Sequence, residues 1–102
     1  MMDIDWIVSK LKQEAYYFSS HADMERMNDN LLISEVEESM MNASIFESYP
    51  NDKRGDSCLL VGFTQAGKPI HSVCGRSGDD LVIITVYIPT PPKFINSYER
   101  SS

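Results

Sequence analysis

Three apolar runs crowd into the stretch between Ser57 and Tyr87, with only short turn-forming segments between them. The runs span residues 58–63, 69–74 and 81–87. They are rich in β-branched and aromatic residues and bounded by Gly, Asp and Ser, which is typical of strands in a buried or half-buried sheet. Connections this short join neighbouring strands in antiparallel order, so the stretch predicts an antiparallel meander.

Flanking segments extend this prediction. Residues 44–49 predict a further strand, whereas the aromatic triplet 16–18 is either a small strand or a linker that packs on the core. The prolines at 89, 91 and 92 end the sheet because proline cannot donate to a strand ladder. We expect residues 96–102 to form a flexible C-terminal tail.

The first half of the chain carries helical signals. Apolar residues recur at helical spacing from Ile4 to Ala15, which predicts an amphipathic helix over 4–15. The spacing of Ser20 and Asp23 fits a capping box and predicts a second helix over about 21–30.

The buried stripe of that second helix is predicted to be Met24, Met27 and Leu31. A second capping-box spacing, Ser34 with Glu37, predicts a third helix, whose inward side chains are Val36, Met40 and Ala43. A methionine group at helical spacing is more typical of a core or a partner surface than of a cofactor site.

Helices followed by antiparallel strands indicate the α+β class. We expect the N-terminal helices to pack on one face of a curved antiparallel sheet of three to four strands. A chain of 102 residues has room for one such domain, over residues 1–95.

Charge and composition exclude several classes of function. The net charge is −6, and residues 1–50 hold ten acidic side chains against three basic ones. A sequence pI near 4.7 argues against an extended nucleic-acid footprint, although a small phosphate pocket remains open. No apolar run reaches the roughly 18 residues of a membrane span. Two cysteines and the lack of a secretory segment favour a reduced, cytoplasmic chain.

Six side chains could support phosphodiester chemistry without a metal ion. An imidazole suits proton transfer, and fixed cations suit the charge of a phosphorane. The candidates are His21, His71, Arg26, Arg76, Lys68 and Tyr87. For His71 the alternative is a satisfied structural histidine in the sheet, and for Arg26 it is a solvated helix cation.

Other site chemistries fit the residues less well. His71 and Cys74 are three residues apart, so in a regular strand they point to opposite faces and cannot share one zinc ion. Cys58 is more typical of a small core residue than of a nucleophile. No G-x-x-x-x-G-K pattern precedes Lys68, which excludes a phosphate loop of that type. We therefore expect no metal and no cofactor.

An ordered set of motifs resembles the bacterial domain of unknown function four-two-five-eight. The set covers about residues 16–94, and it consists of Ser20-His21-Ala22, Glu25-Arg26-Met27, the stretch 33–38, the stretch 57–63, Lys68-Pro69-Ile70-His71 and the stretch 84–89. Many members have arginine four residues after the histidine, where this chain has Glu25.

The resemblance implies a fold and an activity. That family is similar to the RelE/ParE-like toxins, small α+β proteins often encoded beside a zinc-finger or helix-turn-helix antitoxin. The implied activity is metal-independent mRNA cleavage, by attack of the ribose 2′-OH, on free RNA or at the ribosome. The residues carried over are His21 and Arg26 from the helix and His71 and Tyr87 from the sheet.

Two functional hypotheses follow. The first is a RelE-like ribonuclease toxin in which His21 or His71 is the general base, Arg26, Lys68 and Arg76 hold phosphate, and Tyr87 orients the substrate. The second is a non-catalytic protein-binding module, which suits the negative charge and the methionine-rich helices.

Strand parity distinguishes arrangements of the site. A hairpin loop of two or four residues at 77–80 would put His71 and Tyr87 on opposite faces, and only a three- or five-residue loop would bring them together.

Overall fold

The computed structural model describes residues 2–50, 55–90, 94–96 and 99–100. Within these ranges the chain forms three helices, α1 (Ile4–Lys12), α2 (Ser20–Asn28) and α3 (Ile33–Met41). The strands are β1 (Tyr16–Phe18), β2 (Ser44–Tyr49), β3 (Ser57–Phe63), β4 (Pro69–Ser77), β5 (Asp80–Tyr87), β6 (Phe94–Asn96) and β7 (Glu99–Arg100).

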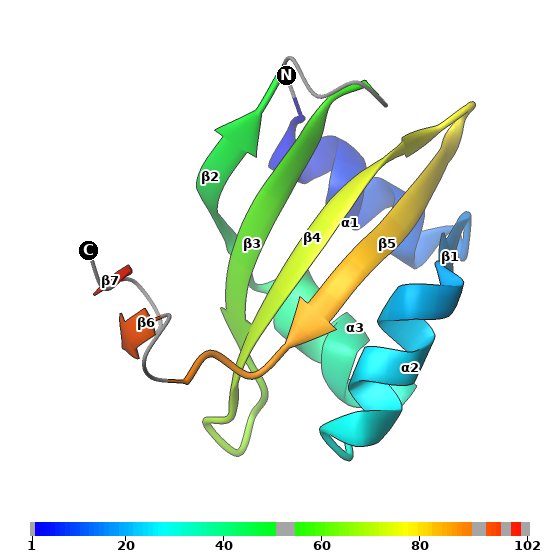
Figure 1. Ribbon diagram of the computed structural model, residues 1–102. Coiled ribbons are helices and arrows are strands. Elements are labelled where there is room, and N and C mark those ends of the chain that lie inside the picture. The colour runs from blue at the N-terminus through cyan, green and yellow to red at the C-terminus, as the bar shows by residue number, and fades with distance from the viewer. Residues whose placement is uncertain (1, 51–54, 91–93, 97–98, 101–102) are drawn as a thin grey trace.

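The meander predicted from the sequence is confirmed. Strands β2, β3, β4 and β5 pair in sequence order, each antiparallel to the next. In Figure 1, α1 and α3 lie behind this sheet, whereas α2 runs beside β5. The fold is therefore α+β, with a helical layer on one face of the sheet; we call the other face the helix-free face, because none of the described helices covers it.

The prediction of an all-antiparallel sheet of three to four strands is wrong. Among the described residues the main sheet has five strands in the order β1-β5-β4-β3-β2, and β1 pairs parallel with β5. The aromatic triplet adds to the outer edge of β5, opposite Leu81–Ile83, where it supplies backbone partners. Three residues are too few to show a period, so the sequence carries no signal for this parallel pairing.

A β-bulge changes which residues of β4 and β5 face one another. The β4–β5 turn holds two residues, Gly78 and Asp79, since Ser77 pairs with Asp80. In a regular ladder His71 would then lie opposite Val86. The register shifts between Val73 and Cys74, where β5 contributes one extra residue, and His71 lies opposite Tyr87 instead. The expectation that a two-residue loop separates the two side chains is therefore wrong.

Helix boundaries differ slightly from the prediction. Helix α1 ends at Lys12 rather than at 15, because Glu14 adopts a positive φ of 56° that a helix cannot continue. The N-cap of α2 is Ser19, whose hydroxyl accepts from the backbone N–H of Ala22 at 3.0 Å. In α3 the cap is Leu32, whose backbone N–H donates to Glu35 at 2.9 Å.

The core lies between the helical layer and the sheet. It contains apolar side chains of every helix and of the central strands, among them Ile7, Ala22, Val36, Met40, Leu60, Ile70 and Ile83. Gly62 lets α3 approach most closely, since a Cβ there would lie 1.9 Å from the carbonyl oxygen of Ser39. Backbone thus packs directly on backbone where α3 crosses β3.

The predicted buried stripe of α2 is only partly present. Leu31 is buried, but the side chains of Met24 and Met27 are 61% and 52% exposed. Helix α2 turns Ala22 into the core and runs beside β5 at the edge of the sheet (Figure 1), and its methionines are left exposed to solvent. For these two methionines the prediction is wrong.

Helix α2 continues the hydrogen bonding of β5 beyond the end of β1. The Ser19 hydroxyl donates to the carbonyl of Ile84 at 2.9 Å, and a Glu25 carboxylate oxygen accepts from the N–H of Val86 at 3.1 Å. One turn later, Asp29 accepts from the N–H of residue 88 at 3.1 Å. Side chains of α2 thus take the place of a neighbouring strand.

The C-terminal segment holds a small second sheet, in which β6 pairs antiparallel with β7. Residues 97–98 and 101–102 of the predicted flexible tail lie outside the described residues. The boundary of the domain at residue 95 stays a prediction.

Candidate functional site

A histidine and a tyrosine meet on the helix-free face, near the start of β4 and at the end of β5. Nδ1 of His71 lies 3.3 Å from the hydroxyl oxygen of Tyr87, and the two ring centroids are 5.3 Å apart. The residues face one another across β4 and β5 because of the extra residue in β5. An imidazole and a phenol at this separation can exchange a proton.

The neighbours of His71 set its burial. Its flanking residues Ile70 and Ser72 point to the helical side, so the imidazole points to the helix-free face. There the ring of Phe46 lies 6.2 Å away, centroid to centroid. His71 is fully buried and Tyr87 is half-buried, which places the phenol, rather than the imidazole, within reach of solvent.

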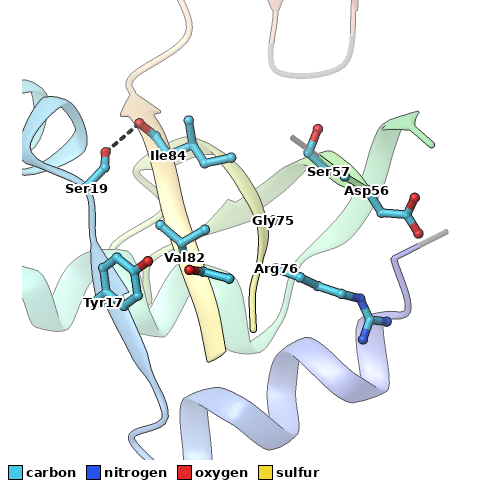
Figure 2. A pocket seen from close by; sticks show the side chains of 10 residues that line it. Tyr17, Ser19, Asp56, Ser57, Gly75, Arg76, Val82 and Ile84 are labelled. Carbon is cyan, nitrogen blue, oxygen red and sulfur yellow. Dashed lines mark hydrogen bonds between the residues drawn. The ribbon is translucent and has the colours of Figure 1, made fainter. Parts of the chain in front are cut away.

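A pocket of about 300 Å³ opens on the same face, toward the other end of β4 (Figure 2). Its floor is the backbone of Gly75 with the side chains of Val82 and Ile84. Figure 2 shows Tyr17 on one side of the pocket and Asp56 on the opposite side. An aromatic ring, the backbone carbonyl of Asp56 and an apolar floor can together hold a flat polar ligand.

The missing side chain of Gly75 helps to form this pocket. A Cβ there would lie 3.2 Å from the carbonyl oxygen of Asp56 and 3.2 Å from the end of Ile84. The pocket and the His71–Tyr87 pair occupy one strand face, because His71 and Gly75 are four residues apart in β4. At about 3.3 Å per residue, the two centres lie roughly 13 Å apart.

Two of the predicted site residues lie on α2. His21 is exposed, and its Nε2 lies 3.3 Å from a carboxylate oxygen of Glu25. Arg26 pairs with Asp23 at 2.7 Å, donates to the carbonyl of Leu31 at 3.2 Å and lies over the ring of Phe18. These contacts close the C-terminal end of α2.

The two predicted phosphate ligands lie apart from one another. Lys68 forms an ion pair with Glu35 at 2.9 Å, and the N–H of Leu32 together with this ammonium group holds the pKa of Glu35 below its usual value. Arg76 lines the pocket and reaches toward α1, where its guanidinium lies 4.2 Å from the centroid of the Trp6 ring (Figure 2). Of the predicted cations, Arg76 is the one that lines this pocket.

The six predicted residues therefore form one contacting pair rather than one cluster. His71 meets Tyr87, and the interactions just described join His21, Arg26, Lys68 and Arg76 to other residues.

The cysteines point into the core. Cys58 and Cys74 are free, fully buried thiols opposite one another on β3 and β4, with their sulfur atoms 3.8 Å apart. The hydrogen bond with Cys58 and burial raise the pKa of the Cys74 thiol, so Cys74 stays protonated. Within the described ranges, no group of three or more His, Cys, Asp or Glu side chains is placed to hold a metal ion.

Sequence reasoning missed two features of the site. Neither Tyr17 nor the floor of the pocket was predicted to belong to a site. The parallel pairing of β1 places Tyr17 beside Val82, and the sequence gives no signal for that pairing. Glu25 was noted only as a departure from the family pattern, yet its carboxylate accepts a hydrogen bond from the Val86 N–H. An acidic side chain one turn after a helix start gives no sequence signal for such a bond.

Comparison with known proteins gives one match. The family model described as "Domain of unknown function (DUF4258)" matches residues 18–88, which run from the last residue of β1 to just past the end of β5. No match was found among curated proteins or among solved structures. No helix in the described part of the chain is long and apolar enough to cross a membrane.

Proposed function

The chain belongs to the Domain of unknown function (DUF4258) family, and we propose that it is the toxin of a bacterial type II toxin–antitoxin pair that cleaves mRNA without a metal ion, as RelE-like toxins do. One observation carries the proposal, namely the His71–Tyr87 pair on a sheet face that no described helix covers. The pair supplies the proton transfer that 2′-OH attack requires.

The chemistry follows from the burial of the two groups. Tyr87 is the more accessible, so its hydroxyl oxygen receives the proton of the ribose 2′-OH while its own proton passes to Nδ1 of His71. The 2′ oxygen then attacks phosphorus, a new P–O bond forms and the bond to the 5′ oxygen breaks. The products are a 2′,3′-cyclic phosphate and a 5′-hydroxyl, whose proton comes from water, and the hydroxide that remains takes the proton that His71 received.

The pocket provides a second contact for RNA. It lies roughly 13 Å from the pair, along the same strand β4. A base stacked on Tyr17, with its edge toward Asp56, would fix the register of the strand. In this proposal Arg76 contributes only its backbone to the pocket, because its guanidinium lies over the Trp6 ring of α1, and we assign it no contact with phosphate.

Three of the predicted site residues take no part in RNA binding in this proposal. His21, Arg26 and Lys68 are engaged within the fold, and we assign them no contact with RNA in this proposal. We place the protein in the cytoplasm, where its two thiols stay reduced and where an antitoxin of the zinc-finger or helix-turn-helix type would bind it.

The test is RNA cleavage by the purified protein in the presence of EDTA. We expect fragments that end in 2′,3′-cyclic phosphate, and a loss of rate of about 10²–10⁴-fold in Tyr87→Phe and His71→Ala. Tyr49→Phe is the matched control, since it removes a hydroxyl from the edge strand β2. Equal cleavage by wild type and Tyr87→Phe would refute the assignment.

Growth after induced expression tests the same proposal in cells. The wild type should arrest growth, the neighbouring gene should restore it, and Tyr87→Phe should grow normally. Cleavage that appears only when ribosomes are added would make the activity ribosome-dependent.

A second candidate function is a non-catalytic protein-binding module of the same fold. The exposure of Met24 and Met27 on α2 favours it, because these apolar side chains are left outside the core. Absence of both a growth defect and RNA cleavage in the wild type would select this second function.

A further inference from the structure

Four large apolar side chains are exposed on α2 and at the start of α3. They are Met24, Met27, Leu32 and Ile33, and they are 45–64% exposed. We call these four residues the methionine ridge. Met24 and Met27 are three residues apart on a helix and therefore neighbours on its surface.

Local structure does not require apolar residues at these positions. The bonds of α2 to the sheet are made by Ser19, Glu25 and Asp29, and its core contact by Ala22. Polar helix formers could replace the methionines at no cost in packing. Exposed methionines close together are typical of surfaces that adapt to an apolar partner.

Charge defines what kind of partner this ridge can take. The segment from Ser20 to Met41 carries six carboxylates and one arginine. That arginine, Arg26, is paired with Asp23 and its side chain is only 17% exposed. Glu35 is likewise paired with Lys68, and the other four carboxylates keep the potential around the ridge negative, which repels nucleic acid and attracts a cationic surface.

We infer that the methionine ridge docks a basic amphipathic helix of a partner protein. The apolar stripe of such a helix would cover the methionines, and its lysines and arginines would lie in the negative potential of α2 and α3. The inference does not depend on RNA cleavage, because the ridge belongs to the helical layer and the His71–Tyr87 pair to the helix-free face.

The test uses a fluorescein-labelled synthetic helix with leucines at helical spacing and lysines elsewhere. We expect micromolar binding by anisotropy, on the order of −8 kcal/mol, that weakens as salt is raised. Two control peptides accompany it. One is a scrambled sequence of the same composition, and the other has glutamate in place of lysine.

Substitution locates the site. Met24→Ser combined with Met27→Ser should weaken binding at least tenfold. Met41→Ser should change it less than twofold, since Met41 is also exposed but lies at the far end of α3. In NMR spectra the methyl signals of Met24 and Met27 should shift on binding, while that of the buried Met40 should not.

Several results would overturn the inference. They are equal binding by the double variant, equal binding of the scrambled or the acidic peptide, and no binding at all by the wild type. Each of these leaves the RNA-cleavage test unaffected, so the two proposals fail separately.

Discussion

Removing the carboxylate of Glu25 should destabilise the fold by releasing β5 from α2. In the structure this carboxylate accepts from the N–H of Val86, a residue whose side chain is fully buried. Hydrogen bonds to charged groups contribute about 1.5–3 kcal/mol, and an orphaned backbone N–H costs about 1–3 kcal/mol. We therefore expect Glu25→Ala to lower the free energy of unfolding by about 2 kcal/mol.

Three comparison variants separate this bond from other effects of the change. Glu25→Gln keeps an acceptor oxygen at the same position and should cost only about 1 kcal/mol, because the bond loses its charge. Asp29→Ala removes the next bond along β5, which is exposed to water, and should cost about 0.5 kcal/mol. His21→Ala removes an exposed contact and should change stability by less than about 0.5 kcal/mol.

Urea unfolding monitored by circular dichroism measures these differences. For a domain of this size a loss of 2 kcal/mol lowers the melting temperature by roughly 10 °C and the urea midpoint by about 1 M. The slope of the unfolding curve should stay constant. If Glu25→Ala unfolds within 0.5 kcal/mol of the wild type, or if Gln costs as much as Ala, the argument about the Val86 N–H is refuted.

Two further changes test the packing and the electrostatics of the fold. Gly62→Ala should lower the free energy of unfolding by about 3 kcal/mol or prevent folding, because its Cβ would meet the backbone of Ser39. Gly75→Ala is the control and should lower it clearly less. Similar melting temperatures for the two variants would contradict the contact between α3 and Gly62. Burial and the hydrogen bond to Glu37 raise the pKa of Tyr16 above its usual 10.0, so the folded state holds this proton longer than the unfolded chain does. Stability should therefore fall as pH rises above about 10, and Tyr16→Phe should fall less steeply; parallel curves for the two proteins would contradict this cause.

The order of strands β3, β4 and β5 could be predicted from the sequence, because short turn-forming segments separate them. Short loops fix β3, β4 and β5 as antiparallel neighbours, and glycines at 67 and 78 adopt the positive φ that these turns need. The bounds of β2 were predicted as the structure has them. Local chemistry was sufficient here, since each pairing joins segments that are adjacent in sequence.

The pairing of β1 with β5 could not be predicted from the sequence. Strand β1 meets β5 across more than sixty residues, and its three aromatic residues fit a linker as well as a strand. The methionines of α2 were assigned to the core because apolar spacing usually marks the buried side of a helix. That rule failed because α2 binds the sheet edge through polar side chains, Ser19 and Glu25, and so buries little of its apolar stripe.

The bulge in β5 connects this edge to the candidate site. A regular two-residue hairpin would put Val86 opposite His71, and it is the extra residue at Ile84 that puts Tyr87 there. The bonds from α2 fall on this same short segment, with Ser19 on the carbonyl of Ile84 and Glu25 on the N–H of Val86. Helix α2 thus stabilises the shifted register from outside the sheet. In the proposed ribonuclease, Ser19 and Glu25 are positioning residues, because they keep Tyr87 opposite His71 while neither touches the pair.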